Sequence, residues 1–216
     1  MVVIASNRGQ VGSFNSNLFT KLAALETEYG TEVLDYVVIG RKAMDIAIRL
    51  GRNVVADFEK MDASPVVDQI EPLAAWLVGE FGNGRYRAVY VVYNHFISTL
   101  SQQSRVFQLL PLVPKAYEQE INNQPTGSAD AEYLFEPSPE AVLRRLLPRI
   151  VESQMFQMLL ESDASEHSAR MVTMKNATEN AGDLILDLTL TFNQLRQNRI
   201  TTELSEITAG KLALEQ

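Results

Sequence analysis

The hydrophobic residues of this chain change their spacing along its length. Over the first 137 residues, short runs rich in valine and isoleucine alternate with stretches in which apolar residues recur every three or four positions. The first pattern is typical of buried strands and the second of amphipathic helices. The runs that predict strands are 2–5, 33–39, 53–58, 88–93, 105–113 and 132–136, and the stretches that predict helices are 15–29, 42–50 and 66–81. This alternation predicts a three-layer, Rossmann-like α/β domain with a mostly parallel sheet.

The remaining residues predict a long C-terminal helix. Ser138 can cap a helix that begins at Pro139, and no proline follows Pro148. We therefore divide the chain into residues 1–137, the α/β domain, and residues 138–216, a helix of the coiled-coil type. If unbroken, this helix would be about 108 Å long, too long for a domain with a radius of gyration of about 14 Å to cover. A break at 162–165, which would give two ordinary helices, is the alternative that the pattern leaves open.

Within this helix, mostly apolar residues alternate four and three positions apart, the spacing of a left-handed coiled coil. The large side chains would contribute about 1.5–3 kcal/mol each on burial, so on the order of 10 kcal/mol together as an upper bound. No other predicted helix is long enough to match them, so they fold back on the α/β domain, pair with a second copy or bind another chain. The positions of this predicted seam are His167, Met171, Met174, Thr178, Ala181, Ile185, Leu188, Phe192 and Leu195.

The composition is that of a chain with a substantial core and an acidic surface. Of the 216 residues, 46% are hydrophobic, and the formal net charge is −8. The acidic balance argues against a general nucleic-acid binder. Because cysteine is absent and only two histidines are present, disulfides, thiolate chemistry and His-rich metal sites are not expected. We see no signal or transit peptide, and no apolar run approaches the ~20 residues that a bilayer span needs, so we expect a soluble protein.

Candidate catalytic and ligand-binding residues are few. Residues 6–12 (SNRGQVG) follow the first predicted strand, where α/β folds place phosphate-binding loops, yet they lack the spacing of the glycine-rich nucleotide motifs. A tight turn is the favoured interpretation. Acidic residues cluster at 57–62 and 161–166 without the spacing of a calcium loop, so we expect them on the solvated surface. His95 has no nucleophile at suggestive spacing, and His167 is expected to pack in the seam. We therefore expect no catalytic residue, no cofactor and no metal.

The segment 193–203 near the end of the helix is rich in long polar side chains and has no acid before Glu203. Arg196 and Gln197 could donate directional hydrogen bonds to a partner loop, since arginine favours carboxylates. An ordinary solvated helix is the alternative of equal weight on the residues alone.

Several segments together resemble the gamma subunit of the F-type ATP synthase. The C-terminal segments are the most specific part of the resemblance, which extends over essentially the whole chain. The segments that carry it are 165–171 (SEHSARM), 174–181 (MKNATENA), Asn193 with Arg196 and Gln197, 200–207 (ITTELSEI) with Gly210, 2–18 (VVIASNRGQVGSFNSNL), 93–97 (YNHFI) and 108–112 (QLLPL).

This resemblance implies a rotor subunit of the central stalk, without catalytic residues of its own. Such a subunit couples proton-driven rotation to ATP synthesis or hydrolysis on a ring of alpha and beta subunits. The implied partners are the alpha, beta and epsilon subunits and the c-ring, and the implied location is peripheral, on the cytoplasmic face of the bacterial inner membrane. By the resemblance, Arg196 and Gln197 contact a loop of the beta subunit, and residues 200–207 lie in the upper shaft.

The resemblance also implies a missing partner. The family has a long helix before the first strand, whereas this sequence begins in that strand, and the helix is the expected partner of the seam at 167–195. A fragment, a misassigned start and a degenerate paralogue are the explanations that stay open. Asn7 stands where the family has an aspartate, and Gln10 and Val11 stand where it has leucine and cysteine. The cysteine-bearing regulatory insert of chloroplast-type members is absent, so we expect no thiol control.

Two other functions stay open on the residues alone. The chain could be a stand-alone interaction module that dimerises through its C-terminal helix. It could also be a small nucleotide-binding enzyme that uses residues 6–12, which is the weakest of the three hypotheses.

Overall fold

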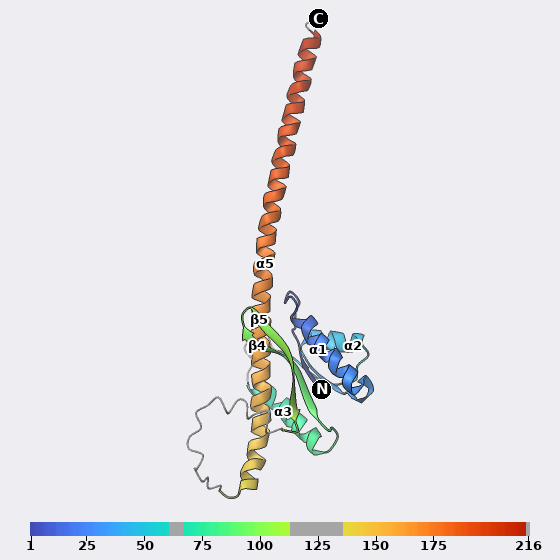
Figure 1. The fold of residues 1–216 in the computed structure, drawn as a ribbon, viewed down its shortest axis with the longest axis vertical. Helices are drawn as coiled ribbons and strands as arrows, with labels where there is room; N and C mark the ends of the chain where they lie inside the picture. The colour runs from blue at the N-terminus through green and yellow to red at the C-terminus, as the bar shows by residue number, and fades with distance from the viewer. Residues whose placement is uncertain (61–66, 113–135, 215–216) are drawn as a thin grey trace. The chain divides into compact units, whose positions relative to one another are not determined.

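The structure is a computed structural model that describes residues 1–60, 67–112 and 136–214 (Figure 1). Contacts group the chain into two compact units, Met1–Met171 and Val172–Gln216, and we describe each by itself. The strand predicted at 132–136 falls almost wholly outside the described residues. The elements in chain order are β1 (Val2–Ile4), α1 (Phe14–Tyr29), the 3-10 helix η1 (Thr31–Val33), β2 (Tyr36–Ile39), α2 (Arg41–Arg49), β3 (Val54–Phe58), α3 (Val67–Gly82), β4 (Val89–Ser98), β5 (Ser101–Leu110) and α5 (Pro139–Leu214).

A five-stranded sheet with the order β3-β2-β1-β4-β5 forms the centre of the first unit. β1 pairs in parallel with both β2 and β4, so that Val3 lies opposite Val38 on one side and Val92 on the other. β2 and β3 are also parallel, whereas β5 runs antiparallel to its hairpin partner β4. The prediction of a mostly parallel sheet is therefore confirmed, and its central strands are buried on both faces, as their continuous apolar runs indicate.

Helices cover both faces of this sheet (Figure 1). α1 and α2 cover one face, where Leu18 belongs to the same apolar cluster as Val3. α3 and the beginning of α5 cover the other face, where Leu73 and Met155 cluster with Ile4. Neighbouring residues of a strand point to opposite faces, so β1 contributes to both clusters. The predicted three-layer arrangement is confirmed.

The β4–β5 hairpin is longer than the sequence predicted. The pattern indicated strands that stop at 93 and resume at 105, whereas β4 continues to Ser98 and β5 begins at Ser101. The added residues are mostly polar and so form no hydrophobic run, but they pair across the hairpin, with one irregularity between Phe96 and Ser98. An antiparallel pair tolerates such polar residues because one face can meet solvent. His95, which follows the predicted strand 88–93, therefore lies inside β4.

α5 is one continuous helix, and the break considered at 162–165 is absent. Ser162 and Ser165 are both 0% exposed. The small side chains of these two serines let α5 lie close to the sheet, since the separation of packed elements depends on the side chains at the contact. The first unit includes α5 as far as Met171. The predicted domain boundary at residue 137 stays a prediction.

Candidate functional site

The second unit contains α5 beyond Met171, and its side chains are open to solvent. Every residue from Lys175 to Gly210 is exposed, and Ile185, Leu188 and Phe192 keep 64%, 59% and 65% of their surface. All nine positions of the predicted seam are exposed: His167, Met171, Met174, Thr178, Ala181, Ile185, Leu188, Phe192 and Leu195. Large contiguous apolar patches on soluble proteins mark interaction sites. This stretch of α5 is therefore the strongest candidate for a partner interface.

Apolar side chains lie on more than one side of this stretch. Successive residues are about 100° apart around an α-helix, so Leu186 and Leu190 lie away from the seam residues Ile185 and Leu188. Leu186 and Leu190 are also exposed, at 64% and 61%. One partner helix covers one stripe, whereas a helix that is apolar on all sides is normally enclosed. The surface therefore suits partners that surround α5 better than a partner that lies along one side.

The predicted contact pair, Arg196 and Gln197, lies on the same exposed stretch. Among the described residues, the guanidinium of Arg196 takes part in no ion pair, whereas Arg199 donates to Glu203 at 2.9 Å. Arg196 therefore has donors to offer a carboxylate or carbonyl of another chain. Contact of this pair with a beta subunit stays a prediction.

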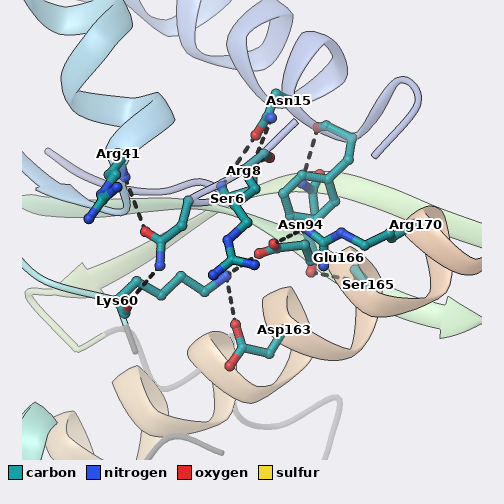
Figure 2. Close-up of polar contacts among 12 residues, drawn as sticks. Ser6, Arg8, Asn15, Arg41, Lys60, Asn94, Asp163, Ser165, Glu166 and Arg170 are labelled. Carbon is teal, nitrogen blue, oxygen red and sulfur yellow. Dashed lines mark hydrogen bonds and ion pairs between the residues drawn. The ribbon is translucent and has the colours of Figure 1, made fainter. Parts of the chain in front are cut away.

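A second group of polar side chains lies between α5 and the sheet within the first unit (Figure 2). Lys60 follows β3 and is 6% exposed, and its ammonium lies 2.6 Å from the carboxylates of both Asp163 and Glu166. Arg170 lies 2.6 Å from Glu166, one turn further along α5. The prediction of a solvated surface is wrong for these two acids. α5 turns them toward the sheet, where Lys60 supplies the opposite charge that a buried carboxylate needs.

A signal for this burial is present in the sequence. Met155, Leu159, Ser162 and Glu166 follow one another at spacings of four, three and four, so the acids continue the face of α5 that starts as an apolar stripe. The partner, Lys60, could not be identified in this way because it is more than a hundred residues away in the chain. Burial raises the pKa of the Asp163 carboxyl, and the attraction of Lys60 opposes this rise.

Asp57 and Glu59, of the other acidic cluster, are exposed as predicted. The third acid of that cluster, Asp62, lies outside the described residues.

The turn after β1 uses its polar groups within the chain. The backbone N–H of Ser6 donates to Asn15 Oδ1 at 3.3 Å. The side-chain amide of Asn7 donates to the carbonyl of Lys60 at 2.5 Å, and its oxygen accepts from the N–H of Arg41 at 3.3 Å. A phosphate-binding loop instead directs its donors to the ligand. The geometry therefore favours the tight turn over a nucleotide site.

Gly40, between β2 and α2, lets this turn and α2 come together. It has a φ of 95°, and a Cβ built on it would lie 2.4 Å from the carbonyl oxygen of Ala5. A side chain at this position would therefore push α2 away from the turn.

The two histidines have different surroundings. His95 Nδ1 lies 2.5 Å from a carboxylate oxygen of Glu161, so this pair joins β4 to α5. His167 is exposed like the other seam positions, and its packing in the seam stays a prediction. Across the described ranges, no group of three or more histidine and acidic side chains is placed to hold a metal ion. In the same ranges, no helix is both long and apolar enough to cross a membrane.

Together these features define a class of protein: an α/β domain that carries a long helix with exposed apolar residues for assembly with other chains. The comparisons with known proteins specify the family. Residues 1–214 match the family model described as ATP synthase. The ATP synthase gamma chain of Roseiflexus sp. (strain RS-1) is 39% identical over 100% of this chain and 72% of its own length. That of Stenotrophomonas maltophilia (strain R551-3) is 41% identical over 99% and 72%. The chain therefore belongs to the family of ATP synthase gamma chains.

Solved structures agree on the fold. A chain of the Euglena gracilis mitochondrial ATP synthase (OSCP/F1/c-ring, rotational state 3) aligns with 99% of this chain and 71% of its own, with a TM-score of 0.70 and 21% identity. A chain from the central stalk and c-ring of the Tetrahymena thermophila mitochondrial ATP synthase aligns with 82% and 75%, with a TM-score of 0.61 and 23% identity. At these identities the likeness concerns the fold alone.

Proposed function

We propose that this chain acts as the central-stalk rotor subunit of an F-type ATP synthase, coupling proton-driven rotation to ATP synthesis or hydrolysis. The observation that carries this proposal is the exposed apolar surface of α5 beyond Met171 in a member of the gamma-chain family. Apolar residues such as Ile185 and Leu190 lie on different sides of the helix, which suits a helix that other subunits surround.

In this role the chain has no catalytic step of its own. A rotor contributes by contacting the surrounding subunits differently at each angle, and it can shift their nucleotide affinities only by the difference between those contacts. Within the proposal, Arg196 and Gln197 are the contact to a beta-subunit loop. The seam from His167 to Leu195 pairs with a helix that the described residues do not contain.

The proposed partners are the alpha, beta and epsilon subunits and the c-ring. The solved relatives support this choice, since similarly folded chains belong to an F1/c-ring assembly and to a central stalk with its c-ring. The proposed location is the cytoplasmic face of the bacterial inner membrane, held there through the other subunits. The gamma chains reported above come from bacteria, which supports this location.

The direct test is assembly. The full chain is purified with the alpha and beta subunits of one of the bacteria named above, and both complex formation and ATP hydrolysis are measured. We expect a stable complex with one copy of this chain. A chain that elutes alone at every concentration, with hydrolysis equal to that of alpha and beta without it, contradicts the proposal.

A matched pair of variants tests the predicted contact. Arg196→Ala removes a guanidinium without an ion-pair partner among the described residues, whereas Arg199→Ala removes one that is paired with Glu203 on the same helix. We expect Arg196→Ala to lower hydrolysis by the complex and Arg199→Ala to leave it nearly unchanged. Equal effects would mean that Arg196 is an ordinary solvated residue. For the second residue of the pair, we expect Gln197→Ala to lower hydrolysis by the complex and Gln194→Ala, the matched control, to leave it nearly unchanged.

Dimerisation through α5 is the second candidate, because the exposed seam would also suit a second copy of the chain. Sedimentation of the chain alone separates the two functions. A concentration-dependent dimer that Leu188→Gln disrupts and Leu190→Gln does not would favour the stand-alone module. A monomer that enters a complex with alpha and beta favours the rotor.

A further inference from the structure

Two kinds of contact hold α5 on the sheet of the first unit. Met155 and its apolar neighbours pack into the cluster formed by the strands. Further along the helix the contacts are polar: Glu161 meets His95, and the hydroxyl of Ser165 donates to the carbonyl of Asn94 at 3.2 Å. The helix therefore passes from an apolar to a polar attachment within about four turns.

Lys60 is central to the polar attachment (Figure 2). Its ammonium lies 2.6 Å from Asp163 Oδ1 and 2.6 Å from Glu166 Oε2, and its side chain is 5% exposed. The two acids are three residues apart, so they lie on the same side of α5, about one turn apart. One lysine thus bridges two successive turns of the helix.

The backbone of Lys60 is also fixed. Its carbonyl accepts the Asn7 side-chain amide at 2.5 Å, and the Asn7 oxygen accepts the N–H of Arg41 at the start of α2. A continuous series of hydrogen bonds and ion pairs therefore runs from α2, through the turn after β1 and the end of β3, to α5. These contacts, drawn in Figure 2, all belong to the first unit.

The two attachments differ in how strongly they specify position. Apolar contacts are non-directional, so α5 could shift slightly along the sheet at small cost. The double ion pair is satisfied in one register, because rotating an α-helix by one residue moves each carboxylate through about 100°. In any other register a buried charge would lose its partner, which is strongly unfavourable.

We propose that Lys60 is a positioning residue that fixes the rotational and axial register of α5 on the sheet. By holding this register, Lys60 lets torque pass between the α/β domain and the helix without slip. The torque part rests on the proposed rotor function, whereas the register part does not.

The register can be measured by pulsed electron paramagnetic resonance. Because the chain has no cysteine, Thr99→Cys in the β4–β5 turn and Ser153→Cys on α5 create the two labelling sites. Both residues are exposed and belong to the first unit. The full chain carrying this pair, with spin labels attached, is expected to give one narrow distance distribution.

The decisive variants alter Lys60 in this labelled background. Lys60→Met removes the charge, and Lys60→Arg keeps it. Because Lys60→Met leaves buried acids uncompensated and could unfold the chain, Lys60→Met combined with Asp163→Leu is the second variant, in which Glu166 keeps Arg170. Lys42→Met is the matched control, since Lys42 pairs with Asp45 on an exposed surface.

We expect the Lys60→Met variants to lose the single narrow distance, and Lys60→Arg and Lys42→Met to keep it. A double variant as narrow as the parent, or a control that broadens equally, overturns the register proposal. In vesicles that contain the complete complex, with the alpha, beta and epsilon subunits and the membrane sector that holds the c-ring, the double variant should pump fewer protons per ATP hydrolysed than Lys42→Met, while binding alpha and beta equally well. An unchanged ratio despite a lost register overturns the torque part alone. Failure of the parent chain to assemble counts against the rotor function and leaves the distance result standing.

Discussion

Two stretches of α5 have similar patterns and different surroundings. In the first unit, Met155 and Met158 repeat at helical spacing and are 0% and 2% exposed. Further along, Met171 and Met174 repeat at the same spacing and are 57% and 37% exposed. Helical periodicity shows that one face of a helix requires cover. Whether the same chain supplies that cover depends on where its other elements lie.

The charged residues of the helix follow the same division. Glu166 is 7% exposed and contacts Lys60 and Arg170, whereas Glu179 lies 4.0 Å from Lys175 with both side chains exposed. A buried pair is sensitive to the loss of one partner, and an exposed pair contributes about 0–1 kcal/mol. The first stretch is therefore built for this chain's own stability, and the second is available to other chains. Four predictions test this division of α5 into a stretch that the chain itself buries and a stretch that stays exposed.

The largest expected effect is in hydrogen exchange along α5. In the isolated chain, amides of residues 182–210 should exchange through local fraying, while those of residues 151–166 should need an opening close to global unfolding. With a global stability of about 5 kcal/mol or more, the rates should differ on the order of a thousandfold. Mass spectrometry of the full chain measures both stretches in one experiment. Equal protection of the amides in both stretches would mean that another part of this chain covers the apolar residues of 182–210.

Two methionines provide a matched comparison of stability. Met155→Ala should lower the free energy of unfolding by about 2–5 kcal/mol, because it leaves a cavity against the sheet. Met171→Ala should change it by less than about 0.5 kcal/mol, because an exposed side chain has little packing to lose. Urea denaturation of the purified chain measures both. Similar losses for the two variants would contradict the division.

Two glutamates provide the polar counterpart. Glu166→Gln should cost about 2–3 kcal/mol, since Lys60 keeps only Asp163 as a charged acceptor while staying buried. Glu179→Gln removes an acid from an exposed pair and should have no measurable effect on unfolding. Thermal unfolding of the two variants checks this. A Glu166→Gln chain as stable as its parent would show that the buried pair adds no stability.

The smallest effect concerns pH. Burial raises the pKa of Asp163 above its ordinary value of 3.8, with Glu166 acting in the same direction and Lys60 and His167 opposing it. The folded state then holds this proton to a higher pH than the unfolded state, so stability falls as pH rises from about 4 through the raised pKa. Asp163→Asn removes this titration. We expect the parent to lose stability relative to the variant across this window, as measured by urea denaturation at a series of pH values. If the parent instead gained stability relative to the variant as pH rises, the attraction of Lys60 would outweigh burial in setting the pKa of Asp163.

The sequence determined the local elements and most of the layer order. The valine-rich runs predicted β1, β2, β3 and the first half of β4. The apolar residues at helical spacing predicted α1, α2 and α3, and the ends of these helices that the structure describes differ from the prediction by one or two residues. These predictions succeeded because burial on one or two faces leaves a regular spacing in the chain. The second half of the hairpin was missed because its polar residues are held by backbone pairing, which leaves no apolar pattern.

Only the tertiary structure decided which side chains meet. The spacing of the acids on α5 was visible, but Lys60 becomes their partner because parallel strands bring the ends of β1, β2 and β3 to one edge of the sheet. The same spacing along α5 is buried at Met155 and exposed at Leu188. A sequence pattern indicates which residues require burial, and the fold alone determines whether the same chain buries them.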